Sequence, residues 1–177
     1  PVPELTPSRA LPDAAPRMAE PETARRIYHQ YIDVDKDENG TPTAIRFHDV
    51  EHFNFGFDVV DAIAAREPDR LAMLHLDREK RERRFSFADM RDLSNRCANY
   101  FRALGVRRGD RVMLVLKRHW QFWPAILGLH KLGAVAIPAT NQLQAHDFEY
   151  RFNAASVAAV LCTADGETAA QVDAVES

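Results

Sequence analysis

Three short runs in which every residue is apolar limit how this chain can fold. These runs are VMLVL at 112–116, AVAI at 134–137 and VAAVL at 157–161. A half-exposed strand alternates apolar and polar residues, whereas a strand covered on both faces does not. The runs begin 22 and 23 residues apart, with helical patterns between them. Such alternation indicates βαβ units with right-handed crossovers, so the predicted fold class is α/β, a mostly parallel sheet flanked by helices on both faces.

Helices are predicted near residues 87–104, 119–132 and 145–155, with a last piece from about Gly166. The first begins at the S-x-x-D pattern of Ser86 and Asp89 and stops at Gly105. Its apolar stripe comprises Phe87, Met90, Leu93, Cys97, Phe101 and Leu104. Trp120 and Trp123 fall in a helix that is apolar on nearly all sides, so both are predicted to pack in the core.

The residues before this α/β pattern divide into two parts. Residues 1–24 hold six of the ten prolines and are predicted to form a flexible arm. Residues 25–52 carry two strand-like runs around Asn39-Gly40, a pair that favours a tight hairpin turn. The α/β region is assigned to 53–177, opening with a short helix that ends at Pro68 and two brief strands, LAMLHLD and RRFSF.

Composition excludes several classes of protein. The formal net charge is −3 with both signs mixed, so no basic surface for nucleic acid is expected. No stretch reaches the roughly 20 apolar residues that a membrane span needs. Cys97 and Cys162 lie far apart and form no C-x-x-C pair, which favours a reducing, cytoplasmic setting. The first residues lack the apolar segment of a signal peptide.

Two segments copy metal-binding patterns, and neither is predicted to hold a metal. His48-Asp49-Val50-Glu51-His52 matches H-x-x-E-H, but its flanks alternate like strands, where positions four apart are about 13 Å from each other. Asp35-x-Asp37-x-Asn39-Gly40 copies the start of a calcium loop, but position 12 is Arg46 instead of the bidentate Glu. A polar connection and a solvated acidic turn are expected instead.

The seven glycines are scattered, so neither a dinucleotide fingerprint nor a Walker loop is present. Two loops follow predicted strands, where ligands of open α/β sheets bind. Lys117-Arg118-His119 could hold an anion at a helix N-terminus or be solvated, and Thr140-Asn141-Gln142 offers neutral donors and acceptors.

Three ordered stretches resemble the medium-chain group of acyl-coenzyme A synthetases, which belong to the acyl-adenylate-forming enzymes. They are RRFSFADMRDLSNRCANYFRALGVRRGDRVMLVLKR, HWQFWPAILGLHKLGAVAIPATNQL and VAAVLCTAD. The resemblance covers roughly residues 53–177 and implies the N-terminal, flavodoxin-like subdomain of a ligase about three times this length. Such a ligase converts a carboxylic acid, ATP and coenzyme A to acyl-CoA, AMP and pyrophosphate through an acyl-adenylate.

The resemblance assigns one binding residue, Gln142, which aligns with the family's coenzyme A-contacting glutamine in the turn PATNQL. It implies ATP, Mg2+ and coenzyme A as cofactors of the complete enzyme. No catalytic residue, metal ligand or bound cofactor is expected in this chain, because the phosphate loop and the catalytic lysine of the family lie later in its sequence. The region 166–171 lacks the arginines of acetyl-specific relatives. Self-association through uncovered apolar surface is expected. The alternative is a self-contained flavodoxin-like binding module.

Overall fold

The computed structural model describes residues 30–164 and 167–176. They fall into two compact units, one ending at Glu51 and one beginning at His52. The predicted arm at 1–24 lies outside the described residues. The domain boundaries proposed from the sequence place the α/β region from residue 53 onward.

The first unit contains an antiparallel hairpin of β1 (Ile32–Lys36) and β2 (Pro42–Phe47). Its turn contains Gly40 at φ +80°, a left-handed conformation that glycine adopts without strain. The Asp37 carboxylate accepts hydrogen bonds from the backbone N–H groups of Asn39 (2.9 Å) and Thr41 (2.8 Å). The hairpin predicted around Asn39-Gly40 is confirmed.

The second unit is built on a three-stranded parallel sheet with the order β6-β5-β7. The strands are β5 (Arg111–Val115), β6 (Val135–Pro138) and β7 (Val157–Cys162). β5 is central, and its residues from Val112 to Val115 are at most 1% exposed. β6 is an edge strand, so no further strand pairs with its outer side. Pro138, which has no N–H to donate, is tolerated in such a strand. The predicted parallel sheet is confirmed.

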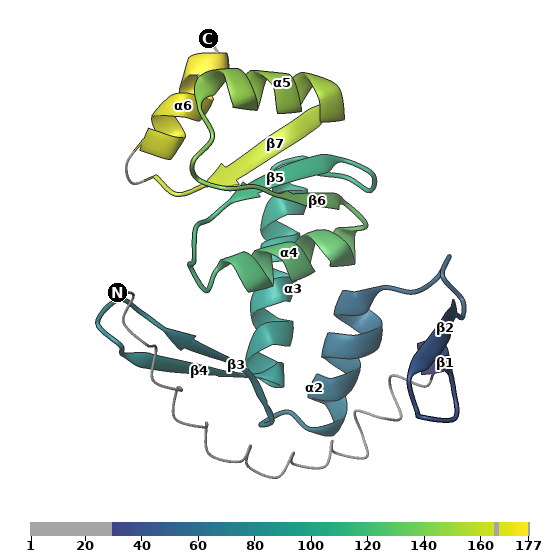
Figure 1. Ribbon diagram of the computed structural model, residues 1–177. Helices are drawn as coiled ribbons and strands as arrows, with labels where there is room; N and C mark the ends of the chain where they lie inside the picture. Colours follow the sequence, from purple (N-terminus) through teal and green to yellow (C-terminus); the bar gives the residue numbers. More distant parts are fainter. Residues whose placement is uncertain (1–29, 165–166, 177) are drawn as a thin grey trace, which may run out of the picture. The chain divides into compact units, whose positions relative to one another are not determined.

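Helices cover both faces of this sheet (Figure 1). They are α3 (Phe87–Ala103), α4 (Phe122–Leu132), α5 (Ala145–Ala155) and α6 (Glu167–Glu176). Val112 and Leu114 pack with α3 and α4 on one face, while Met113 and Val115 pack with α5 and α6 on the other. Each β5 side chain therefore enters one of two cores, which is why the sequence run lacks polar alternation.

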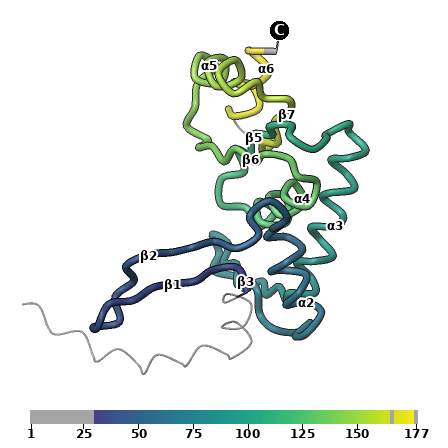
Figure 2. Tube along the Cα trace, turned by 90° about the vertical axis from the view of Figure 1, so that its right-hand side faces the viewer, coloured from purple at the N-terminus to yellow at the C-terminus, as the bar shows by residue number. Residues whose placement is uncertain are grey.

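α3 and α4 lie side by side in both views (Figures 1 and 2). A Cβ added at Gly128 of α4 would lie 2.8 Å from Cβ of Cys97 on α3, so only glycine allows this approach. Ser86 and Asp89 form the predicted capping box, and Gly105 follows the helix at φ +93°. Both predicted ends of α3 are confirmed.

One predicted core position is wrong, and one residue of the predicted α3 stripe is exposed. Leu104 is 64% exposed, because it is the last residue of the α3 stripe and the chain turns away at Gly105. Trp123 is 52% exposed, whereas Trp120 is half-buried against Phe85 at a ring-centroid distance of 4.9 Å. Helix α4 also begins only at Phe122, so Trp120 belongs to the preceding loop and Trp123 to the outer side of the first helical turn.

A third core forms under an antiparallel hairpin of β3 (Leu71–Leu76) and β4 (Glu82–Ser86). Phe85 and Met90 pack there with Val60 and Leu127. The helix predicted before Pro68 is present, but it starts as a π-helix, η1 (Phe55–Asp61), and continues as α2 (Ala62–Arg66). The wider turn of a π-helix does not follow from an apolar pattern of period 3.6.

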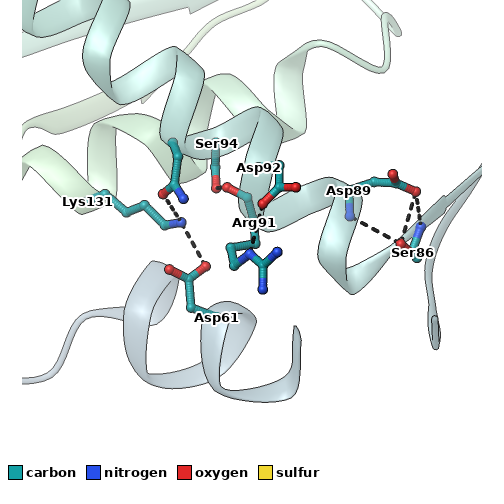
Figure 3. A network of polar contacts seen from close by, with 8 residues as sticks. Asp61, Ser86, Asp89, Arg91, Asp92, Ser94 and Lys131 are labelled. Carbon is teal, nitrogen blue, oxygen red and sulfur yellow. Dashed lines mark hydrogen bonds and ion pairs between the residues drawn. The ribbon is translucent and has the colours of Figure 1, made fainter. Parts of the chain in front are cut away.

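A buried lysine connects η1 to α3 and α4 (Figure 3). Nζ of Lys131 donates to Oδ1 of Asp61 and Oδ1 of Asn95, both at 2.7 Å, and its side chain is 2% exposed. Nδ2 of Asn54 donates to the carbonyl oxygen of His130 (2.7 Å). A Cβ at Gly56 would lie 2.8 Å from Cγ of Lys131. These contacts position the π-helix, and through it the third core.

Candidate functional site

The turn after β6 presents the predicted binding residue Gln142. Gln142 is exposed, and its backbone N–H donates to Oγ1 of Thr140 (3.3 Å). Before the turn, the N–H of Ala139 donates to the carbonyl of Leu114 in β5 (2.9 Å). After it, the side chain of Leu143 is buried among residues of the α5 and α6 core. The exposed side-chain amide of Gln142 therefore lies in a turn that is anchored on both sides, by the hydrogen bond of Ala139 and by the buried side chain of Leu143.

The start of α5 is fixed behind this turn. Gln144 and Asp147 form a capping box, in which the N–H of Gln144 donates to Oδ2 of Asp147 (3.0 Å). Oε1 of Gln171 in α6 accepts a hydrogen bond from the N–H of Ala145 (2.7 Å). The first N–H groups of a helix need such partners, and supplying them from the side chains keeps the turn in one conformation.

The loop after β5 carries the second predicted group, Lys117-Arg118-His119, and all three residues are exposed. Lys117 adopts φ +48°, and the N–H of His119 donates to the carbonyl of Leu116 (3.0 Å). β5 and β6 are parallel neighbours, so this loop and the Gln142 turn both leave the sheet at the carboxyl ends of its strands. The structure therefore brings the two predicted loops to one edge, the one where such sheets bind ligands.

An apolar depression of about 560 Å3 lies at the same edge, between α3, α4 and the end of β7. Phe101, Leu116 and Leu161 line its floor. Oγ1 of Thr163 is buried there without a hydrogen-bond partner among the described residues. Cys97 lines it as well, and burial raises the pKa of its thiol, so the thiol is an inert apolar group at neutral pH.

The two metal-like patterns adopt geometries that suit other roles. Residues 48–52 form a bend and a turn, not the helix that H-x-x-E-H requires. Both oxygens of Asp35 accept hydrogen bonds from Arg46, and the pKa of this carboxyl is lowered by that contact. Within residues 30–164 and 167–176, no three His, Cys, Asp or Glu side chains gather as a metal site. Both cysteines are half-buried.

Sequence reasoning missed the depression and the Lys131 contacts. The depression combines residues of α3, α4, β5 and β7 that are far apart in the chain. Thr163 offered a weak signal, since it directly follows an apolar strand at the edge where ligands bind. Lys131 offered none, because a lysine near a helix C-terminus is usually solvated and interacts with the helix dipole.

A parallel sheet covered by helices on both faces, with its exposed polar groups in the loops at one edge, defines a doubly wound α/β ligand-binding domain. A family model described as AMP-binding enzyme matches residues 60–177, and the chain belongs to this family. The resemblance seen in the sequence is confirmed. A self-contained binding module would share only the architecture of the family. The match of the family model over residues 60–177 is more than shared architecture.

Acyl-coenzyme A synthetase ACSM3, mitochondrial, from Homo sapiens is 35% identical over 133 residues, which cover 72% of this chain and 22% of that protein. A fatty acyl CoA synthetase from Mycobacterium tuberculosis aligns with a TM-score of 0.62 and 30% identity, covering 70% of this chain and 24% of that one. The N-terminal domain of FACL13 from the same organism gives a TM-score of 0.63 at 30% identity, covering 71% of this chain and 30% of that chain.

These proteins are much longer than the matched region. The chain spans about a fifth of the length of the curated relatives it matches. No helix in residues 30–164 and 167–176 is long and apolar enough to cross a membrane.

Proposed function

We propose that this chain is the N-terminal part of an acyl-CoA ligase. The complete enzyme joins a carboxylic acid to coenzyme A in two steps, forming an acyl-adenylate and pyrophosphate from ATP and then transferring the acyl group to the thiol. The observation that carries the proposal is the family match over residues 60–177, together with an exposed glutamine turn at the ligand-binding edge of the sheet.

Gln142 is the residue of this chain that we assign to coenzyme A. Its side-chain amide can donate to a phosphate or carbonyl oxygen and accept from an amide N–H of the pantetheine arm. The anchored turn supports this role, since a preorganised side chain loses little entropy on binding. The amide is neutral, so it contributes position and specificity more than electrostatic affinity.

ATP and Mg2+ belong to the complete enzyme in this proposal. Phosphoryl and adenylyl transfer depend on backbone N–H groups and charges aimed at the phosphates. The sequence has no glycine-dense loop for that purpose, and we derive no step through the nucleotide or the metal in this chain. We therefore expect the isolated chain to form no acyl-adenylate.

The apolar depression beside Thr163 supports the expected self-association. Its lining is largely apolar, and exposed apolar surface promotes association in water. Sedimentation velocity at several concentrations tests this, and a monomer at every concentration would contradict it. The compartment stays a prediction: the cysteines favour a reducing setting such as the cytoplasm, while the relatives named above include a mitochondrial protein.

The test of the ligase proposal is the sequence that follows Ser177 in the gene. A Gly-rich, Ser/Thr-containing loop ending in Pro-Lys would support it, and a stop codon directly after residue 177 would contradict it. A second test incubates the pure chain with ATP, Mg2+ and octanoate. The proposal expects no pyrophosphate, and measurable release would contradict the inactivity of the isolated chain.

A further inference from the structure

A second depression, of about 380 Å3, lies between β4, α3 and the loop before α4. Three arginines line it, and two aromatic rings form part of its wall. These residues are Arg83, Arg84, Arg96, Phe85 and Trp120. The volume is within the range of small-molecule sites. The proposed function assigns no role to these residues.

Aromatic contacts orient Arg83. Its guanidinium carbon lies 5.3 Å from the ring centroid of Trp120 and 6.0 Å from that of Phe85. A cation–π contact uses the flat face of the guanidinium and leaves its N–H edges free to bind an anion. Because Phe85 is buried and packs on Trp120, the stacking surface under Arg83 is fixed by the third core.

The aspartates that line the same depression are already engaged (Figure 3). Oδ2 of Asp89 accepts hydrogen bonds from the backbone N–H and the hydroxyl of Ser86 (2.8 and 3.0 Å). Oδ1 of Asp92 accepts from Nε of Arg91 (2.8 Å), and this bond lowers the pKa of Asp92, with a smaller contribution from Arg96.

None of the guanidinium groups of the three lining arginines forms a hydrogen bond or an ion pair within the part of the chain that the structure describes. Together with Arg91 they outnumber the two aspartates. The depression therefore carries net positive charge, and its guanidinium N–H donors are available to a ligand.

The depression also lies close to the ligand-binding edge of the sheet. Trp120 belongs to the loop after β5, and the same loop contacts the β3–β4 hairpin a second time, where Nε2 of His75 lies 3.3 Å from the carbonyl oxygen of Arg118. These two contacts bring Arg83 of β4 beside a loop that leaves the carboxyl end of a parallel strand. Ligands of such folds bind at this edge.

We propose that this arginine depression binds the phosphate group of a small molecule, with Arg83 as the oriented donor. Guanidinium groups suit phosphate because several N–H donors match its oxygens in pairs. The inference is independent of the proposed ligase function, since it concerns residues other than Gln142. ATP and coenzyme A share the required chemistry and are distinguished by the test.

The test titrates the full chain with pyrophosphate in metal-free buffer. In a Trp123→Phe background Trp120 is the single tryptophan, so its fluorescence reports directly on the depression. We expect saturable binding that weakens as salt rises from 50 to 300 mM. Isothermal titration calorimetry gives an affinity that is independent of the fluorescence of each variant.

Arg83→Gln is expected to weaken pyrophosphate binding about tenfold, the value of one charge-assisted hydrogen bond. Arg96→Gln is expected to weaken it at least threefold. Arg83→Lys keeps the charge but loses the planar fork, and should lie between Arg83→Gln and the parent. The matched control is Arg102→Gln, an α3 arginine whose guanidinium donates to Asn99 and which lies outside the depression; this variant should change affinity less than twofold.

The sources are separated by comparing ATP, coenzyme A and dephospho-coenzyme A. Tighter binding of coenzyme A than of its dephospho form would assign the depression to the 3′-phosphate, and equal binding of the two would assign it to the diphosphate that both share with ATP. Either result supports a phosphate site. No saturable binding of pyrophosphate, or equal losses in Arg83→Gln and Arg102→Gln, would overturn it, while leaving the role of Gln142 unaffected.

Discussion

Nζ of Lys131 lies 2.7 Å from Oδ1 of Asp61, joining the C-terminal turn of α4 to the last residue of the π-helix. The lysine side chain is 2% exposed and that of Asp61 is 22% exposed. A charge so deeply buried is tolerated because Asn95 and the ring of Phe57, 5.4 Å from Nζ, supply further partners. The pair therefore fixes η1 on the helices that cover the sheet.

Lys131→Met should lower the free energy of unfolding by about 3 kcal/mol, because it leaves Asp61 partly buried without its partner. Asp61→Asn keeps a hydrogen-bond acceptor but leaves the more deeply buried Lys131 ammonium without its counter-ion, so it should cost at least as much. Urea denaturation followed by circular dichroism measures both. Arg102→Met on exposed α3 surface is the control and should change stability by less than 0.5 kcal/mol. A loss no larger than the control would show that the pair contributes nothing to folding.

Gly128→Ala should destabilise the chain by about 2–3 kcal/mol, since the new methyl would meet Cβ of Cys97 at 2.8 Å and the backbone nitrogen of Ala98 at 2.9 Å. Gly105→Ala provides the comparison. Nothing lies within 4 Å of its added Cβ, and only the left-handed φ of +93° is strained, at a cost of about 1 kcal/mol. Thermal denaturation of both variants decides the order, and a greater loss for Gly105→Ala would contradict the close helix contact.

In the complete ligase, Gln142→Ala should raise the KM for coenzyme A about two- to twelvefold, the value of one ordinary hydrogen bond of about 0.5–1.5 kcal/mol. ATP–pyrophosphate exchange, which reports adenylate formation, should stay nearly unchanged. Asn141→Ala, in the same exposed turn, is the matched control. A collapse of exchange, or equal effects of both variants on the KM, would refute the assignment of Gln142 to coenzyme A.

His130 should make stability depend on pH. Burial lowers the pKa of this imidazole, and its Nδ1 has no partner among the described residues. The unfolded chain therefore binds a proton more readily, with a pKa of about 6.5. The contribution of His130 is fully present above that pH and is lost as the pH falls through the lower pKa of the folded state.

Urea denaturation at pH 5, 6 and 7 measures this dependence. The free energy of unfolding should decrease toward pH 5, and His130→Leu should reduce the slope. His146, whose side chain is 80% exposed, gives the control variant His146→Leu, for which the slope should persist. A slope unchanged in His130→Leu would exclude this histidine as its source.

The sequence by itself determined the elements of the α/β unit, because their causes are local or periodic. The all-apolar run at 112–116 requires a strand covered on both faces, and Ser86 and Gly105 supply the ends of α3 through their own side chain and backbone. In a doubly wound fold the loops that follow the parallel strands lie at the carboxyl end of the sheet. The order of the elements was therefore enough to place the turn of Gln142 where ligands bind.

Only the tertiary structure decided which side chains meet across elements. Trp123 and Lys131 share one helix, yet the tryptophan is 52% exposed and the lysine is buried, the reverse of what their polarity suggests. Whether a side chain is buried depends on the residues opposite it. Asp61 neutralises the charge of the lysine, and both Asp61 and Asn95 accept hydrogen bonds from it. Likewise, Arg83 became an oriented donor because Trp120 lies under it. Burial follows from partners far apart in sequence, which no local pattern contains.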